Sequence, residues 1–234
     1  MEYNNMNFLI DDFKGWNKLD YGWLFIACVA IIGITLMMGG STISIISALA
    51  NVVCVILVAQ GKLSNYIWGT VGVITYAYLA YTWGYYGETF LNAVYYLPMQ
   101  FIGFYFWYKN EGNVDNTVSN SVIINHIGTK AKMFGIALIP VLIGIASYVL
   151  FLLGGKLVIL DATTTVLSIV AMILMTMRLK EQWYLWIVVN VISIYMWFDA
   201  FMNGNSDGIA TLLMWSVFLL NAIYGLYKWS KRKA

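Results

Sequence analysis

The apolar residues of this chain fall into long runs that are separated by short polar turns. A run of roughly 20 apolar residues can cross a bilayer core of about 30 Å as a helix. Runs of this length occur at approximately 21–38, 41–60, 64–83, 88–108, 133–153, 159–178, 182–202 and 208–227. The pattern therefore predicts an all-α integral membrane protein with eight transmembrane helices.

Composition supports a membrane protein and offers little chemistry for catalysis. Hydrophobic residues make up 61% of the 234 residues and charged residues 10%, against roughly 25% charged in soluble domains. Cys28 and Cys54 lie in apolar runs, and His126, the single histidine, lies in a polar linker. Motifs for nucleotide loops, zinc ligands and catalytic triads are not present. We therefore expect no catalytic residue, metal site or cofactor, and neither an enzyme nor a nucleic-acid partner.

Basic residues are divided unevenly between the two membrane faces that eight spans define. Alternate turns lie on opposite faces, and lysine and arginine gather on the cytoplasmic one. Of the 13 basic residues, all except Lys156 fall on the side that holds both termini. This distribution predicts a multi-pass protein with both termini in the cytoplasm. The first twenty residues are unlike a signal peptide, so we expect the first helix to be retained.

The two halves of the chain resemble each other when the sequence is shifted by 118 residues. The shift aligns Lys62 with Lys180, Tyr66 with Tyr184 and Trp68 with Trp186. A single helix between two three-helix units gives both units the same orientation, which makes a parallel 3+1+3 repeat. We therefore predict four segments: an extra N-terminal helix in 1–40, a first unit in 41–108, a polar linker with the connector helix in 109–158, and a second unit with a basic tail in 159–234.

Uncharged polar side chains are expected near the middle of the membrane on several helices. Counting inward from the helix ends places Asn51, Tyr76, Gln100, Asn190 and Asn221 there, together with Ser168 and Ser193. The acids Glu88, Asp161, Asp199 and Asp207 fall toward the outer ends of their helices. Polar groups at this depth indicate a functional site, and the alternative is hydrogen bonding that only joins helices. The pattern favours one uncharged cavity for a small molecule.

Two tryptophans and an asparagine share one face of the seventh predicted helix. Trp183, Trp186 and Asn190 occupy positions i, i+3 and i+7, which lie on one side of a helix. Indole faces stack on flat rings, and an amide hydrogen-bonds to a polar ring edge. A cationic ring adds about 0.5 to 2 kcal/mol of attraction. For Trp183 the alternative is an ordinary interfacial tryptophan.

This W-x-x-W-x-x-x-N pattern, with the 3+1+3 layout, resembles the PnuC family of bacterial vitamin transporters and, through it, the SWEET-type fold. The segment KLSNYIWG in the first half is also similar to the family. The resemblance implies a multi-pass protein of the bacterial inner membrane that takes up nicotinamide riboside. The absence of charged residues from the middle of the spans predicts that this uptake is facilitated diffusion. The resemblance also implies a separate kinase that traps the vitamin, and a substrate site lined by Trp183, Trp186 and Asn190.

Other functions stay open from the residues. Thiamine is a cationic vitamin of the same kind, and the family also contains transporters for it. A retinal protein needs a buried lysine within a span, and no span here has one in its interior. A structural membrane protein would use the amides only to join helices. Besides the bilayer and a small molecule, a second copy of the chain is a further partner that the sequence leaves open.

Overall fold

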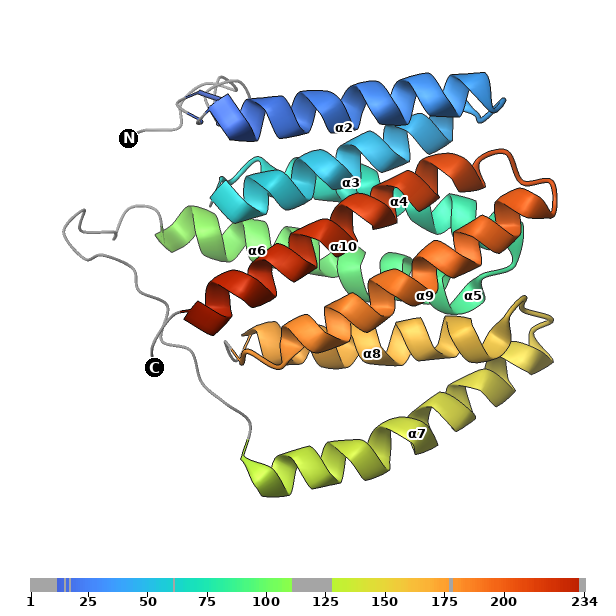
Figure 1. Cartoon of the computed structure of the whole chain (residues 1–234). Coiled ribbons are helices and arrows are strands. Elements are labelled where there is room, and N and C mark those ends of the chain that lie inside the picture. The colour runs from blue at the N-terminus through green and yellow to red at the C-terminus, as the bar shows by residue number, and fades with distance from the viewer. Residues whose placement is uncertain are drawn as a thin grey trace.

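The computed structural model describes residues 12–14, 16, 18–60, 62–110, 128–176 and 179–231, and its elements are all helices (Figure 1). Their bounds are α2 Lys18–Met37, α3 Thr42–Gln60, α4 Asn65–Trp83, α5 Tyr86–Phe90, the π-helical turn η1 Leu91–Tyr96, α6 Leu97–Asn110, α7 Thr129–Leu152, α8 Val158–Thr176, α9 Gln182–Met202 and α10 Gly208–Lys231. Residues 111–127, which form most of the linker predicted at 109–132 and include His126, lie outside the described residues, as do residues 1–11 and 232–234.

Each predicted apolar run is helical over the residues that the structure describes, and the fourth differs in form. The run expected at 88–108 begins at Tyr86 and consists of α5, η1 and α6. Pro98 explains the change of geometry, because proline has no backbone N–H and its ring clashes with the carbonyl four residues earlier. A π-helical turn before Pro98 accommodates both effects, and such turns often occur at functional sites.

Helices α2, α4, α7 and α9 all turn at one end of the bundle, each through a glycine. Gly39, Gly84, Gly154 and Gly204 have positive φ angles there, a conformation that glycine adopts without steric cost. Gly84 ends α4, and the N–H of Tyr85 returns to the carbonyl of Ala80 at 2.9 Å. We call this the glycine-turn end. The start of α2 and the end of α10 lie at the opposite, terminal end (Figure 1).

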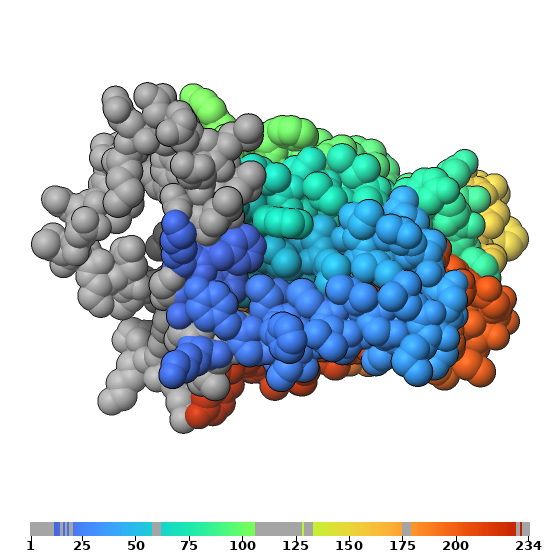
Figure 2. Space-filling view, turned by 90° about the horizontal axis from the view of Figure 1, so that it is seen from above, coloured from blue at the N-terminus to red at the C-terminus, as the bar shows by residue number. Residues whose placement is uncertain are grey.

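The bundle consists of antiparallel pairs of consecutive helices, and α3 and α10, which both begin at the glycine-turn end, pack in parallel. Helix α3 packs on α4, α8 on α9 and α9 on α10, while α10 also contacts α3 and α2. Helix α7, which contains Pro140, lies at the edge against α8 and curves along its length (Figure 1). Figure 2 shows α2 lying across one face of the molecule. The site described below therefore lies among α3 to α6 and α8 to α10.

The outward faces of α2 and α7 are apolar. Phe25 and Met37 on α2 and Phe134 and Ile136 on α7 are more than 60% exposed. Met133–Leu152, Gln182–Met202 and Gly208–Tyr227 are long and apolar enough to span a membrane. Shorter apolar helices are Tyr21–Met37, Thr42–Leu57 and Val158–Leu174. These surfaces suit lipid, and eight complete crossings stay a prediction.

Carboxylates from outside the first three-helix unit accept hydrogen bonds from its helix N-termini. Asp207, next to the start of α10, accepts from the N–H of Ser41 just before α3. Asp12 accepts from the N–H of Ser64 before α4, at 2.9 Å. Asp161 of α8 accepts from two amides at the start of α5. Anionic groups stabilise helix N-termini, where backbone N–H groups lack partners within the helix. These contacts fix the first unit against the rest of the chain.

Candidate functional site

The predicted line of residues on α9 exists and extends further than the sequence suggested. Trp183, Trp186 and Asn190 are followed on the same helical face by Ser193 and Trp197, as the 3.6-residue period requires. Asn190 and Ser193 are buried, and Trp197 is completely so. The face therefore runs from the terminal end of α9 almost to the glycine-turn end.

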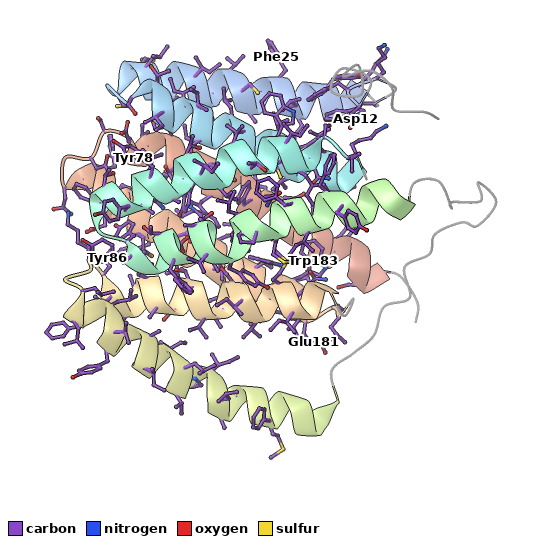
Figure 3. All side chains as sticks on the ribbon, turned by 180° about the vertical axis from the view of Figure 1, so that it is seen from behind. Asp12, Phe25, Tyr78, Tyr86, Glu181 and Trp183 are labelled. Carbon is purple, nitrogen blue, oxygen red and sulfur yellow. The ribbon has the colours of Figure 1, made fainter. Side chains whose placement is uncertain are left out.

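Trp183 and Trp186 are partly buried in the bundle. Figure 3 shows Trp183 among the helices, whereas Phe25 points outward. The absence of a side chain at Gly225 of α10 makes room for the Trp183 ring, because a Cβ atom at Gly225 would overlap the six-membered part of the indole. Trp186 packs against the hydrophobic core. Glycine on α10 is thus the reason why a large flat side chain fits at this depth.

Tyr76 of α4 is the centre of a buried hydrogen-bond cluster. Its hydroxyl accepts hydrogen bonds from the indole N–H groups of Trp197 on α9, at 3.0 Å, and Trp215 on α10, at 3.2 Å. It donates to Oε2 of Glu88 on α5, at 3.2 Å. Both indole rings also contact the Tyr76 ring, with centroids 5.7 and 6.0 Å away. We call these four residues the Tyr76 cluster.

Glu88 and Asp161 are buried next to each other and are held differently. Asp161 has no exposed surface, and its two oxygens accept hydrogen bonds from the N–H groups of Gly87 and Glu88, both at 2.8 Å. Glu88 is 2% exposed; its Oε2 accepts from Tyr76 and its Oε1 has no hydrogen-bond partner. Gly87 allows this approach, because a Cβ there would meet Asp161 and Thr165.

The structure does not gather all seven predicted site residues around one point. Asn51 packs on Gly72 of α4, and its amide donates to the carbonyl of Ser47 on its own helix at 2.9 Å. Gln100 packs on Gly69 of α4, beside Cys54. Asn221 is half-buried on α10. Within the described ranges, none of the amides of Asn51, Gln100, Asn190 and Asn221 is hydrogen-bonded to another. Tyr76, the predicted site residue on α4, contacts residues of α5, α9 and α10.

Glu88, Trp197 and Trp215 were missed by the sequence interpretation. The sequence places Glu88 toward the outer end of its helix and predicts an uncharged cavity around residues such as Tyr76. That expectation is wrong, because α5 folds Glu88 back onto α4, which buries its carboxylate. The helical period that relates Trp183, Trp186 and Asn190 also reaches Trp197, and this signal was present in the sequence.

The arrangement suits the binding of a small molecule. No group of three or more His, Cys, Asp or Glu side chains suitable for a metal occurs in the described part of the chain. Cys28 and Cys54 are free thiols. Indole faces, amides and a carboxylate can hold a flat polar molecule by stacking and hydrogen bonds.

Comparison with known proteins gives the family. The family described as nicotinamide mononucleotide transporter matches residues 41–231. The chain belongs to this transporter family. A relative from Neisseria mucosa named nicotinamide riboside transporter PnuC is 34% identical, with 94% of this chain and 83% of that protein covered. One of the same name from Haemophilus influenzae is 36% identical, with 93% and 92% covered.

A solved structure also matches, one titled crystal structure of the vitamin B3 transporter PnuC. It has 32% sequence identity and a TM-score of 0.77, and the match covers 97% of each chain. The resemblance to the PnuC family is therefore confirmed. The relatives are named as transporters, so this member is a transporter and not an enzyme. Membership in the family makes it an integral protein of the inner membrane.

Proposed function

We propose that this transporter takes up nicotinamide riboside across the bacterial inner membrane by facilitated diffusion. The two relatives at 34% and 36% identity are named for this substrate. The observation that carries the proposal is the continuous face of α9 that begins with Trp183 and Trp186 and continues through Asn190. Such a face suits a ligand with a flat cationic ring and a carboxamide.

In this proposal the pyridinium ring stacks against the indoles of Trp183 and Trp186, and the Asn190 amide hydrogen-bonds to the carboxamide. Stacking and cation–π attraction are both strengthened by burial. Gln100, Asn51, Asn221 and Tyr76 complete the predicted lining. For Asn51 a structural role competes, because its amide already donates within α3. Thiamine, also a cationic vitamin, is the alternative substrate.

The transport mechanism proposed is alternating access between two three-helix units. The units are 41–108 and the helices of 159–234; 109–158 supplies the connector, and 1–40 the extra helix. A parallel 3+1+3 arrangement of the SWEET type, with eight spans and cytoplasmic termini, places the substrate near the bilayer midplane between the units. Phosphorylation by a separate cytoplasmic kinase would retain the vitamin after entry.

Binding titrations of the purified full-length protein test the substrate. We expect saturable binding of nicotinamide riboside and weaker binding of thiamine and riboflavin. Trp186→Ala should weaken riboside binding by about 1 to 3 kcal/mol, the cost of losing stacking on an aromatic ring. Asn190→Leu should weaken it by removing the hydrogen bond to the carboxamide.

Trp23→Ala provides the matched control, because Trp23 on α2 is 40% exposed and lies away from the α9 face. Its affinity should equal that of the wild type. Normal riboside affinity in both α9 variants would place the site elsewhere. Tighter binding of thiamine than of the riboside by the wild type would replace the proposed substrate.

A further inference from the structure

Tyr76 has no capacity for another hydrogen bond. A phenol has one proton and two lone pairs, and an indole N–H can only donate. Trp197 and Trp215 occupy both lone pairs of the Tyr76 oxygen, so its proton must be directed to Glu88. The cluster thereby fixes Oε2 of Glu88 as an acceptor. The cluster supplies no donor to Oε1, and the hydroxyl of Thr164, which lies near the Glu88 carboxylate, donates its one proton to the carbonyl of Asp161 at 3.0 Å.

Glu88 differs from the neighbouring Asp161 in having a carboxylate oxygen without a hydrogen-bond partner. Buried carboxylates in folded proteins normally have hydrogen-bond partners on their oxygens. Asp161 follows this rule, with one backbone amide on each oxygen at 2.8 Å. Glu88 is 2% exposed, and its Oε1 has no hydrogen-bond partner. Asp161 therefore has the bonding of a structural residue, whereas Glu88 has room for a donor from outside the protein.

Further buried hydroxyl groups without partners accompany Glu88. Thr165 Oγ1 on α8 lies against Gly87, the residue before Glu88, and has no hydrogen-bond partner. Ser193 Oγ is also unpartnered, and it lies on the α9 face between Asn190 and Trp197. The π-helical turn η1 follows shortly after Glu88. Three buried oxygens, on Glu88, Thr165 and Ser193, thus lack hydrogen-bond partners near the part of the α9 face toward the glycine-turn end.

The unpartnered polar groups lie further along the α9 face than the proposed binding position of the ring. Asn190 and Trp197 are seven residues apart, which is a rise of about 10 Å along the helix. A ligand whose ring lies against Trp186 and Asn190 can extend its sugar past Ser193 toward the Tyr76 cluster. Sugar hydroxyls are donors, and an acidic side chain that accepts from a ribose hydroxyl is a recurrent mode of nucleoside recognition.

We propose that Glu88 determines specificity by accepting a hydrogen bond from a sugar hydroxyl of the substrate through Oε1 and by excluding an anionic phosphate. This inference rests on the proposed function, because it assumes a nucleoside with its ring on the α9 face. The carboxylate attracts a hydroxyl donor and repels a phosphate, and both effects are large in a buried site. The groups bonded to Tyr76 are a carboxylate and two indole N–H groups, and none is cationic. A nucleoside is therefore favoured over its mononucleotide.

Affinities of the wild type and of Glu88→Gln for nicotinamide riboside and nicotinamide mononucleotide test the inference on purified full-length protein. Glutamine keeps the shape and can still accept from Tyr76, but it carries no charge. We expect riboside binding to weaken about 10- to 100-fold, as for loss of a hydrogen bond to a charged group. Mononucleotide binding should not weaken, so the preference for the riboside should fall by at least about 10-fold. Asp199→Asn, which removes an acid on α9 at the same end, should leave the preference unchanged.

A purely structural role of Glu88 predicts equal losses for both ligands. An unchanged preference in Glu88→Gln would overturn the inference and leave riboside transport intact. Failure of the wild type to bind the riboside would overturn both.

Hydroxyl-deleted ribosides provide a second test, on the wild type alone, in case Glu88→Gln does not fold. Removal of one hydroxyl, 2′, 3′ or 5′, should cost at least about 10-fold in affinity. In a folded Glu88→Gln the same deletion should cost much less, because the two changes remove one interaction. Equal wild-type affinity for all three deoxy ligands would contradict the inference.

Discussion

The Tyr76 hydroxyl joins helices that are far apart in the sequence. Its partners lie on α5, α9 and α10, up to 139 residues away. Each bond satisfies a polar group that would otherwise be buried without a partner. Networks of this kind favour one arrangement of the core, because a partly satisfied network is costly.

Tyr76→Phe should destabilise the protein strongly while changing little of its shape. The substitution leaves two indole N–H groups and one carboxylate oxygen unpaired, at about 1 to 3 kcal/mol each. We expect the free energy of unfolding to fall by about 3 kcal/mol or more, measured by thermal unfolding in detergent. Tyr78→Phe on the same helix is the control, since Tyr78 is 54% exposed. Equal melting temperatures for the two variants would show that the hydrogen bonds of the Tyr76 hydroxyl do not stabilise the fold.

The positions of some site residues could be predicted from the sequence around them, and those of others could not. The common face of Trp183, Trp186 and Asn190 followed from the helical period alone, and α9 is helical over those positions. Their contact with substrate stays a prediction. Glu88 could not be found in this way, because its burial depends on a chain reversal at Gly84 and on packing against α8. Neither is visible in the residues around it.

At the level of elements, hydrogen bonds between the two three-helix units are concentrated at the glycine-turn end. Asp161 joins α8 to α5, Asp207 joins the start of α10 to the start of α3, and Tyr85 donates to the carbonyl of Met196 on α9 at 2.6 Å. In addition, the N–H of Lys156, which belongs to the connector segment, bonds to the carbonyl of Gly84 at 2.9 Å. Opening of the bundle at this end therefore requires these bonds to break.

Asp161→Asn tests the strongest of these links. The asparagine keeps one acceptor oxygen and turns an N–H group toward a backbone donor. The start of α5 therefore loses one of its two hydrogen bonds to α8. We expect the amides of Gly87 and Glu88 to exchange with deuterium at least about 10-fold faster, since exchange reports local opening. Asp199→Asn should leave their exchange unchanged. Unaltered protection in Asp161→Asn would show that packing alone holds α5.

Helix limits were predicted well, and the form of the fourth helix was not. The seventh run, predicted at 182–202, coincides with α9, because apolar length and polar turns mark both of its ends. The π-helical turn Leu91–Tyr96 was missed because hydrophobicity averaged over a run cannot separate a π turn from α-helix. Pro98 was the available signal, since proline in a helix interior requires a local adjustment.

For the whole molecule, the common position of the helix ends makes the proposed topology testable. The glycine turns lie at one end and the start of α2 and end of α10 at the other, and the distribution of basic residues predicts the latter as cytoplasmic. After Cys28 and Cys54 are replaced by alanine, Asn203→Cys should react with a membrane-impermeant maleimide in intact cells. Ser230→Cys should react only after permeabilisation. The reverse pattern would overturn the orientation.

Uniport is the whole-molecule prediction that depends most on charge. Ion-coupled transporters generally use an acid or histidine within the membrane whose occupancy changes with conformation. Of the buried acids here, Asp161 is held by two backbone amides, and Glu88 is bonded to Tyr76 through Oε2, with Oε1 proposed above to accept from the substrate. The sequence also has no nucleotide-binding motif through which ATP could drive transport.

Uptake of nicotinamide riboside into proteoliposomes that contain buffer alone tests this prediction. The internal concentration should rise to the external one and stop there, with or without an imposed proton or sodium gradient. Protein-free liposomes give the background, and Trp186→Ala should reduce the initial rate without changing the final level, because a downhill carrier alters only the rate. Sustained accumulation under either gradient would overturn uniport. Glu88→Gln would then be the variant to examine for loss of coupling, since Glu88 is the buried acid with an unoccupied oxygen.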